Sequence, residues 1–137
     1  MTEHRDRVTE LRLVVTATDY EAAVRFFRDV LGLREREAYE GNGGYVVILD
    51  AGRATLEIND PPYAEYIDEV EVGHRVAGGI RVAFEVADTR AATAELVDAG
   101  AELIAEPTLT PWDTLNSRLH GPEGLLLTVF GSVDPEN

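Results

Sequence analysis

The chain has 137 residues, and its 12 basic and 26 acidic side chains give a formal charge of −14 at pH 7 and a sequence pI of about 4.4. All 12 basic residues are arginine. Such a negative surface repels phosphate groups, so we expect neither nucleic acid nor an anionic membrane as a partner. A hydrophobic content of 45% with 28% charged residues is typical of a globular domain rather than a disordered tail.

Residue types that the sequence lacks exclude further classes. Without cysteine there are no disulfides, thiolate metal sites or cysteine nucleophiles. No apolar run approaches the roughly 20 residues that a membrane span needs. The N-terminal residues 1–10 are polar and contain no signal-peptide core. We therefore expect a cytoplasmic protein.

An internal repeat organises the chain. Residues 11–19 resemble residues 80–88 at an offset of 69, and the similarity continues through the alanine pairs 22–23 and 91–92. Each copy reads as a strand followed by a helix, which predicts two related modules of about 60 to 70 residues. The alternative is a chance similarity between two ordinary strand–helix units.

The first predicted helix begins at Asp19, whose side chain can accept hydrogen bonds from free backbone N–H groups. Gly32 ends it, where a left-handed residue is favoured. Its apolar residues recur at helical spacing and are Ala23, Phe26, Phe27, Val30 and Leu31. Strands are predicted next, with glycine turns between them, at residues 34–40, 45–50 and 53–59.

The second half repeats this order. Its helix begins at Asp88 and ends at Gly100, with Ala92, Leu96 and Ala99 on the inner face. Strands are predicted at residues 102–106, 114–120 and 125–131, with a turn at residues 121–124. Each half is then a β-α-β-β-β module, and the fold class is α+β.

These predictions divide the chain into five parts. They are a polar N-terminal segment (1–10), a first module (11–59), a connection (60–79), a second module (80–131) and a tail (132–137). The connection is long for a compact domain, and such segments often rim a binding site. Either its residues Tyr63 and Tyr66 cover a pocket, or it is a linker with a short helix.

The duplicated module resembles the vicinal oxygen chelate family, which includes glyoxalase I, extradiol dioxygenases, fosfomycin-resistance enzymes and bleomycin-resistance proteins. The motifs that carry the resemblance are Asp19 with FFRDVLGL at residues 26–33, FEVAD at 84–88 and GPEGL at 121–125. A shorter match, Pro111-Trp112 followed by Arg118, is similar to bleomycin-resistance proteins. The resemblance implies two curved half-barrel sheets that enclose a cup. It also implies a homodimer in which modules of different chains pair.

The family's metal ligands decide which chemistry the resemblance implies. Enzymes of the family place ligands on the first and last strand of each module, and these positions hold Arg12, Glu57, Arg81 and Thr128 here. An arginine side chain stays protonated and has no lone pair for a metal. Since a catalytic metal centre needs about three protein ligands, we expect no metal and no other cofactor.

The three histidines do not replace the missing ligands. His4, His74 and His120 have no metal-ligand spacing to one another, and we interpret each as solvated or capping. A chance assembly of Glu57 with His74 or His120 is the open alternative. The acidic run at residues 68–71 is interpreted as a solvated surface.

Several other residues are candidates for contact with a ligand. If Arg12 and Glu57 share a sheet face, they form a buried pair, and Arg12 or Arg81 can instead bind a carboxylate or phosphate of a ligand. Both arginines face solvent if the strand register differs by one residue. Loop residue Trp112 either stacks on a ligand or seals the barrel edge. The remaining predicted ligand contacts are Tyr63, Tyr66, Asp113 and Arg118.

The sequence thus favours a metal-independent protein that binds and sequesters a small organic molecule, such as an antibiotic or other natural product. The acidic charge suits a cationic ligand, with Glu57 and Asp113 pairing to it. The first alternative is a metal-independent enzyme in which Glu57 is the acid or base and an arginine stabilises an anionic intermediate. A metal-dependent glyoxalase-like or dioxygenase-like enzyme is the second.

Overall fold

The computed structural model describes residues 7–30, 32–76 and 78–134. His4, and Leu31 of the predicted apolar stripe, lie outside the described residues. The first half contains β1 (Val8–Thr16), α1 (Tyr20–Val24), η1 (Arg25–Val30), β2 (Glu35–Gly41), β3 (Gly44–Ala51) and β4 (Ala54–Asn59). Helix α2 (Pro61–Glu71) follows. The second half contains β5 (Ile80–Val86), α3 (Thr89–Asp98), β6 (Glu102–Leu109), β7 (Thr114–His120), η2 (Pro122–Gly124) and β8 (Leu126–Ser132).

The eight strands form one mixed open sheet in the order β2-β3-β4-β1-β5-β8-β7-β6. Within each half, the first strand runs parallel to the last, as β1 to β4 and β5 to β8. The halves join where β1 pairs antiparallel with β5. The predicted α+β fold of two β-α-β-β-β modules is confirmed. The expectation that modules pair between chains is wrong, because β1 and β5 of the same chain pair directly.

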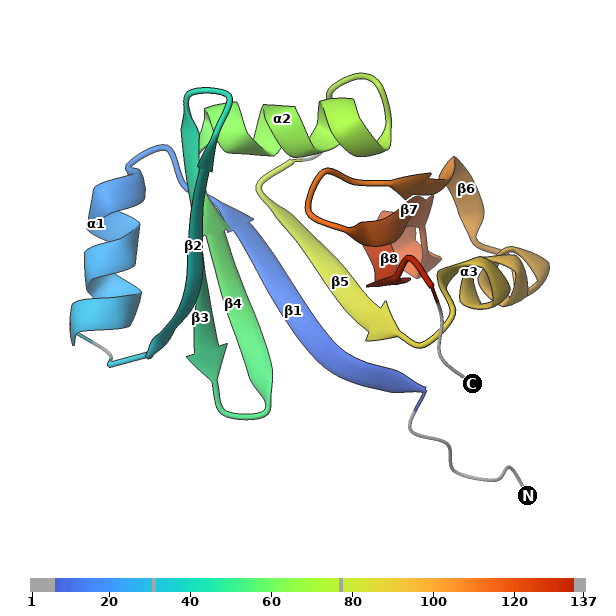
Figure 1. Ribbon diagram of the computed structural model, residues 1–137, viewed down its shortest axis with the longest axis horizontal. Helices are drawn as coiled ribbons and strands as arrows, with labels where there is room; N and C mark the ends of the chain where they lie inside the picture. Colours follow the sequence, from blue (N-terminus) through green and yellow to red (C-terminus); the bar gives the residue numbers. More distant parts are fainter. Residues whose placement is uncertain (1–6, 31, 77, 135–137) are drawn as a thin grey trace.

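Helices α1 and α3 lie at opposite ends of the sheet, beside the outer strands of their own halves (Figure 1). The apolar core under α1 includes Val24, Leu49 and Ile58, and the core under α3 includes Leu119 and Val129. Since strand side chains alternate between faces, the residues next to these core positions point into the concave side of the sheet. None of the helices in the described ranges has the length and apolar character to span a membrane.

Both predicted helix starts are present, but the first helix changes form along its length. The side chains of Asp19 and Asp88 accept hydrogen bonds at 3.1 Å from the backbone N–H groups of Ala22 and Ala91. After Val24 the helix widens into the π-helical turn η1. A π turn holds more residues than an α turn, so later side chains rotate away from the predicted stripe. Phe26 and Val30 are therefore 59% and 73% exposed.

Helix α2 fills most of the central connection and spans from β2 and β3 of the first half toward β6 and β7 of the second (Figure 1). The carboxylate of Asp60 starts it by accepting hydrogen bonds from the backbone N–H groups of Tyr63 and Tyr45, both at 3.0 Å. Gly44 makes this close approach possible, because a Cβ atom there would lie 2.4 Å from the Tyr63 nitrogen. The connection is thus a short helix whose inner face, with Tyr63 and Ile67, packs over the cup.

Candidate functional site

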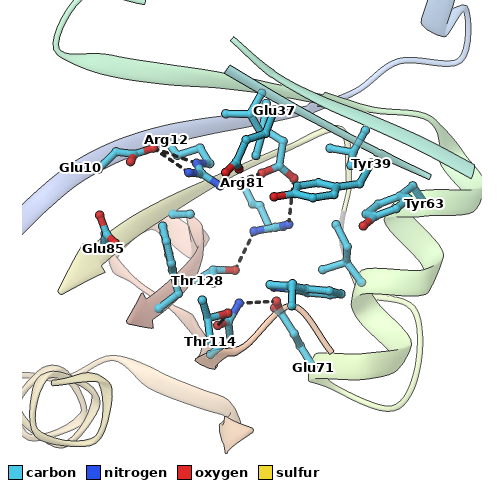
Figure 2. Close-up of a pocket in the computed structure, with 18 of the residues that line it drawn as sticks. Glu10, Arg12, Glu37, Tyr39, Tyr63, Glu71, Arg81, Glu85, Thr114 and Thr128 are labelled. Atoms are coloured by element: carbon cyan, nitrogen blue, oxygen red, sulfur yellow. Dashed lines mark hydrogen bonds and ion pairs between the residues drawn. The ribbon is translucent and has the colours of Figure 1, made fainter. Parts of the chain in front are cut away.

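A cavity of about 460 Å³ lies between the concave sheet face and α2 (Figure 2). Both halves of the chain line it, from Glu10 and Arg12 on β1 to Thr128 and Phe130 on β8. Its wall combines aromatic side chains with carboxylates and guanidinium groups. The charged lining residues are Glu10, Arg12, Arg36, Glu37, Glu57, Glu71, Arg81 and Glu85.

Arg12 and Glu57 share the concave face and form the ion pair considered from the sequence. Val14 of β1 is paired with Glu57 of β4, and Arg12 lies two residues before Val14 on the same strand. The side chains of Arg12 and Glu57 therefore lie on the same face of the sheet. Arg12 Nη1 lies 3.3 Å from Glu57 Oε1. The guanidinium also donates to Glu10 at 3.0 Å and to the Thr55 hydroxyl at 3.1 Å. Arg12 is therefore held on several sides, and the alternative in which it faces solvent is wrong.

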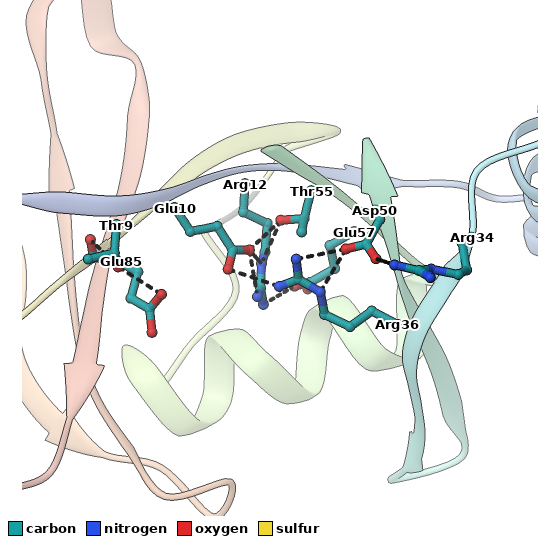
Figure 3. Close-up of polar contacts among 9 residues, drawn as sticks. All are labelled: Thr9, Glu10, Arg12, Arg34, Arg36, Asp50, Thr55, Glu57 and Glu85. Carbon is teal, nitrogen blue, oxygen red and sulfur yellow. Dashed lines mark hydrogen bonds and ion pairs between the residues drawn. The ribbon is translucent and has the colours of Figure 1, made fainter. Parts of the chain in front are cut away.

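This pair belongs to a longer row of alternating charges, which we call the charge row and which Figure 3 shows except for Arg81. From its outer end to its inner end, the row consists of Arg34, Asp50, Arg36, Glu10, Arg12, Glu57 and Arg81. The N···O distances between successive members are 3.2, 2.7, 3.1, 2.9, 3.3 and 4.0 Å. Hydrogen bonds from Thr55, Arg12 and Arg36 outweigh the effect of burial and hold the pKa of Glu10 below its usual value.

Arg81 stands at the inner end of the charge row and is only 6% exposed. Its Nη1 donates to the Thr128 hydroxyl at 2.8 Å, while its Nη2 lies 4.0 Å from Glu57 Oε2. Burial, together with repulsion from Arg118, lowers the pKa of Arg81. The guanidinium therefore points into the cavity (Figure 2), and the alternative in which it faces solvent is wrong.

In the family that the sequence resembles, metal ligands stand at four positions. The residues at all four positions line the cavity here, but their side chains do not fit a divalent ion. Arg12 and Arg81 bring two guanidinium cations that have no lone pair to donate. Thr128 uses its hydroxyl to accept from Arg81, and Glu57 alone offers a carboxylate. Among the described residues, no three His, Cys, Asp or Glu side chains are grouped to hold a metal ion.

The two described histidines lie outside this group. His74 is exposed after α2, and neither it nor His120 lines the cavity. His120 Nδ1 lies 3.4 Å from Glu102 Oε1 at the far end of β7. The structure therefore does not bring Glu57 together with His74 or His120.

A second polar cluster, not predicted from the sequence, consists of Asp68, Glu71 and Arg118. Arg118 donates from Nη2 to Asp68 and from Nε to Glu71, both at 2.8 Å, and all three side chains are buried. The interpretation of residues 68–71 as a solvated surface is wrong at these two positions. The available signal was the i, i+3 spacing of the two acids, which places them on one helix face. Arg118 holds α2 to β7 and does not line the cavity.

The aromatic candidates separate into lining and supporting residues. Trp112 and Tyr63 line the cavity, whereas Tyr66 packs behind them with its ring centre 6.0 Å from that of Trp112. Burial and the nearby charge of Glu57 raise the pKa of Tyr63 to about 12. Asp113 is exposed and lies outside the lining. Lining residues missed from the sequence include Glu37, Tyr39, Glu71, Asn116 and Phe130.

Comparison with known proteins gives one family and several similar folds. A family model described as the Glyoxalase/Bleomycin resistance protein/Dioxygenase superfamily matches residues 10–129. A hypothetical protein from Bacillus halodurans C-125 superposes with a TM-score of 0.67 at 18% identity, covering 96% of this chain and 97% of that one. No protein of curated function matches the sequence.

Two enzymes are also among the similar structures. Methylmalonyl-CoA epimerase, in complex with methylmalonyl-CoA and an ammonium ion, gives a TM-score of 0.62 at 22% identity, with 96% and 97% of the two chains covered. NAD-dependent benzaldehyde dehydrogenase from Legionella pneumophila gives 0.65 at 13% identity, with 89% and 98% covered. At these identities the likeness concerns the fold alone.

Proposed function

Because the chain belongs to the Glyoxalase/Bleomycin resistance protein/Dioxygenase superfamily, we propose that it binds and sequesters a small organic molecule in its cavity without a metal ion. The observation that carries this proposal is the donor set at the four family ligand positions. Two of the four are guanidinium groups, and the single carboxylate, Glu57, is engaged with Arg12. Such a set suits the recognition of polar groups on a ligand better than Lewis-acid chemistry.

The remaining wall suits a ligand that has an aromatic or apolar body. Trp112 and Tyr63 line the cavity and can pack on a flat organic molecule, and Phe130 adds to the aromatic wall with the Arg12 guanidinium 5.1 Å from its ring centre. Glu37 and Glu85 also line the cavity, and neither forms an ion pair with an arginine in the described ranges. These two carboxylates favour a cationic group on the ligand, as in many natural products and antibiotics.

A binding screen tests the proposal. Candidate natural products are added to the purified protein, and the melting temperature is measured with divalent metals in parallel. Ligand at about 100 times its Kd should add about 2.7 kcal/mol to the free energy of unfolding. Trp112→Ala should weaken binding, whereas Leu109→Ala, at an exposed site outside the cavity, should not. A stoichiometric divalent ion in the purified protein, with no stabilisation by any organic compound, would contradict the proposal.

The alternative function is a metal-independent enzyme in which Glu57 is the acid or base. The observation that favours it is the placement of this carboxylate in the cavity, 3.3 Å from one guanidinium and 4.0 Å from another that can stabilise an anionic intermediate. Similar folds include an epimerase in complex with an acyl-CoA. Glu57→Gln should then abolish turnover of any bound compound, while the exposed control Glu102→Gln should leave it intact.

We also propose that the protein is a homodimer. On the convex face of the central strands, which none of the described helices covers, the exposed residues Leu11 and Leu13 of β1 pair with the half-buried residues Phe84 and Val82 of β5. These four residues carry no charge in a chain of net charge −14, which favours contact with a second copy at this strip. Leu13→Glu should convert a dimer to a monomer in sedimentation velocity, and Leu109→Glu on distant β6 should not. A wild-type monomer at all concentrations would contradict the proposal.

A further inference from the structure

Arg81 is a buried cation with most of its hydrogen-bond donors unused. A guanidinium group has five N–H donors. In the described part of the chain, Arg81 forms one hydrogen bond, from Nη1 to Thr128, and its nearest carboxylate oxygen, on Glu57, lies at 4.0 Å. The one fully enclosed side-chain atom found without a partner in that part of the chain is Nη1 of Arg118. The unbonded nitrogens of Arg81 are therefore accessible from the cavity.

The neighbouring carboxylates are already engaged by other donors. Glu57 accepts at Oε1 from Arg12 and at Oε2 from Asn59, both at 3.3 Å. Glu71 faces the cavity from α2, but its two oxygens accept from Arg118 and Asn116 at 2.8 and 2.7 Å. Neither carboxylate has an oxygen placed to complete the hydrogen bonding of Arg81.

The charge row explains why the shortage falls on this residue. It contains four arginines and three carboxylates, so one arginine has no acid of its own. At the outer end, Arg34 is solvated, with 84% of its side chain exposed. Arg81, at the inner end, has no such access to bulk water. Its pKa is lowered by burial and by Arg118, although Glu71, Glu57 and Asp68 act in the opposite direction.

We infer that the free side of Arg81 binds a carboxylate group of the ligand. This inference rests on the proposed binding function and names one chemical group of the ligand. The planar guanidinium matches a carboxylate with two parallel hydrogen bonds, and the low dielectric of a buried site strengthens them. Thr128 is the positioning residue, because its hydroxyl fixes the orientation of the guanidinium. The body of the ligand then extends toward Trp112 and Phe130 on the cavity wall.

Two matched probes test the inference. Binding of 4-(trifluoromethyl)benzoate and of the neutral 4-(trifluoromethyl)benzamide is measured by fluorine NMR, and the Arg81 Nε–H signal is followed in nitrogen-15 spectra. The benzoate should bind at least about tenfold more tightly, since a hydrogen-bonded charge pair contributes about 1.4 kcal/mol or more. It should also shift the Arg81 signal.

Variants separate the role of Arg81 from general damage to the fold. Arg81→Lys keeps the charge but loses the planar fork, so the preference for benzoate should fall severalfold. Arg81→Met should abolish the preference while the amide still binds, and Arg53→Met, in an exposed turn, should change neither. Equal binding of the two probes to the wild type would overturn the inference and leave the proposed function standing. An Arg81 signal unmoved by millimolar benzoate would also overturn it.

Discussion

Replacement of Arg118 by methionine should destabilise the protein strongly, because two buried carboxylates would lose their shared cation. Arg118 and Asp68 are both 0% exposed and Glu71 is 3% exposed. Arg118 donates to each acid at 2.8 Å. Methionine fills a similar volume but supplies neither charge nor donors. The acids would then remain buried and lose their central cation, although Arg75 lies 3.5 Å from Asp68 and Asn116 and the Val76 backbone N–H still donate hydrogen bonds to Glu71 and Asp68.

The expected magnitude follows from this burial. Removal of one partner from a buried ion pair costs about 3–5 kcal/mol. A domain of this size has a total stability of about 5–15 kcal/mol, so the loss is a large fraction of it. The melting temperature should fall by roughly 10–20 °C. The matched control is Arg34→Met, which removes an exposed ion pair with Asp50 and should cost about 0–1 kcal/mol.

Urea unfolding followed by tryptophan fluorescence measures both variants, since Trp112 is the single tryptophan and packs on Tyr66 of α2. Addition of Asp68→Asn and Glu71→Gln to Arg118→Met should recover part of the loss, because both uncompensated charges are then removed. If Arg118→Met costs no more than Arg34→Met, the reasoning that the cluster's charges are buried and mutually dependent is refuted.

Two further predictions concern the start of α2. Gly44→Ala should lower the free energy of unfolding by about 1–3 kcal/mol, because the new Cβ would lie 2.4 Å from the Tyr63 nitrogen and 2.7 Å from Asp60 and would force β3 away from the N-terminus of α2. Gly79→Ala, whose Cβ would meet no atom within 4 Å, is the control in the same unfolding assay. The raised pKa of Tyr63, about 12 against a usual 10.0, means that the folded state holds the phenol proton more tightly than the unfolded state. The free energy of unfolding should therefore fall as the pH rises from 10 to 12, and this group should not affect it below pH 10. In chemical denaturation at a series of pH values, Tyr63→Phe should reduce the dependence of the free energy of unfolding on pH above 10.

Local features of the fold were predictable because neighbouring residues determine them. Asp19 and Asp88 are helix caps whose side chains act on the next turn, and Gly100 ends α3 with a positive φ of 114°. The repeat also predicted that Arg12 and Arg81 occupy equivalent places. Neither inference needs contacts between distant parts of the chain.

Features that depend on distant partners were not predictable in the same way. Asp68 and Glu71 read as solvated because their cation, Arg118, lies some fifty residues further along the chain. Pairing of β1 with β5 in one chain uses the same strand edges that pairing between chains would use, so the sequence of the strands cannot distinguish them. The π turn η1 replaced a regular helix although the apolar spacing favoured one.

The union of both modules in a single chain has a consequence for the shape of the site. If identical modules met across a symmetry axis, every substitution on one wall would recur on the other. In this chain, Glu57 occupies one wall while the equivalent position of the second half holds Thr128. Each half can therefore diverge alone, and the two unlike walls of the cavity can distinguish the two ends of an asymmetric molecule.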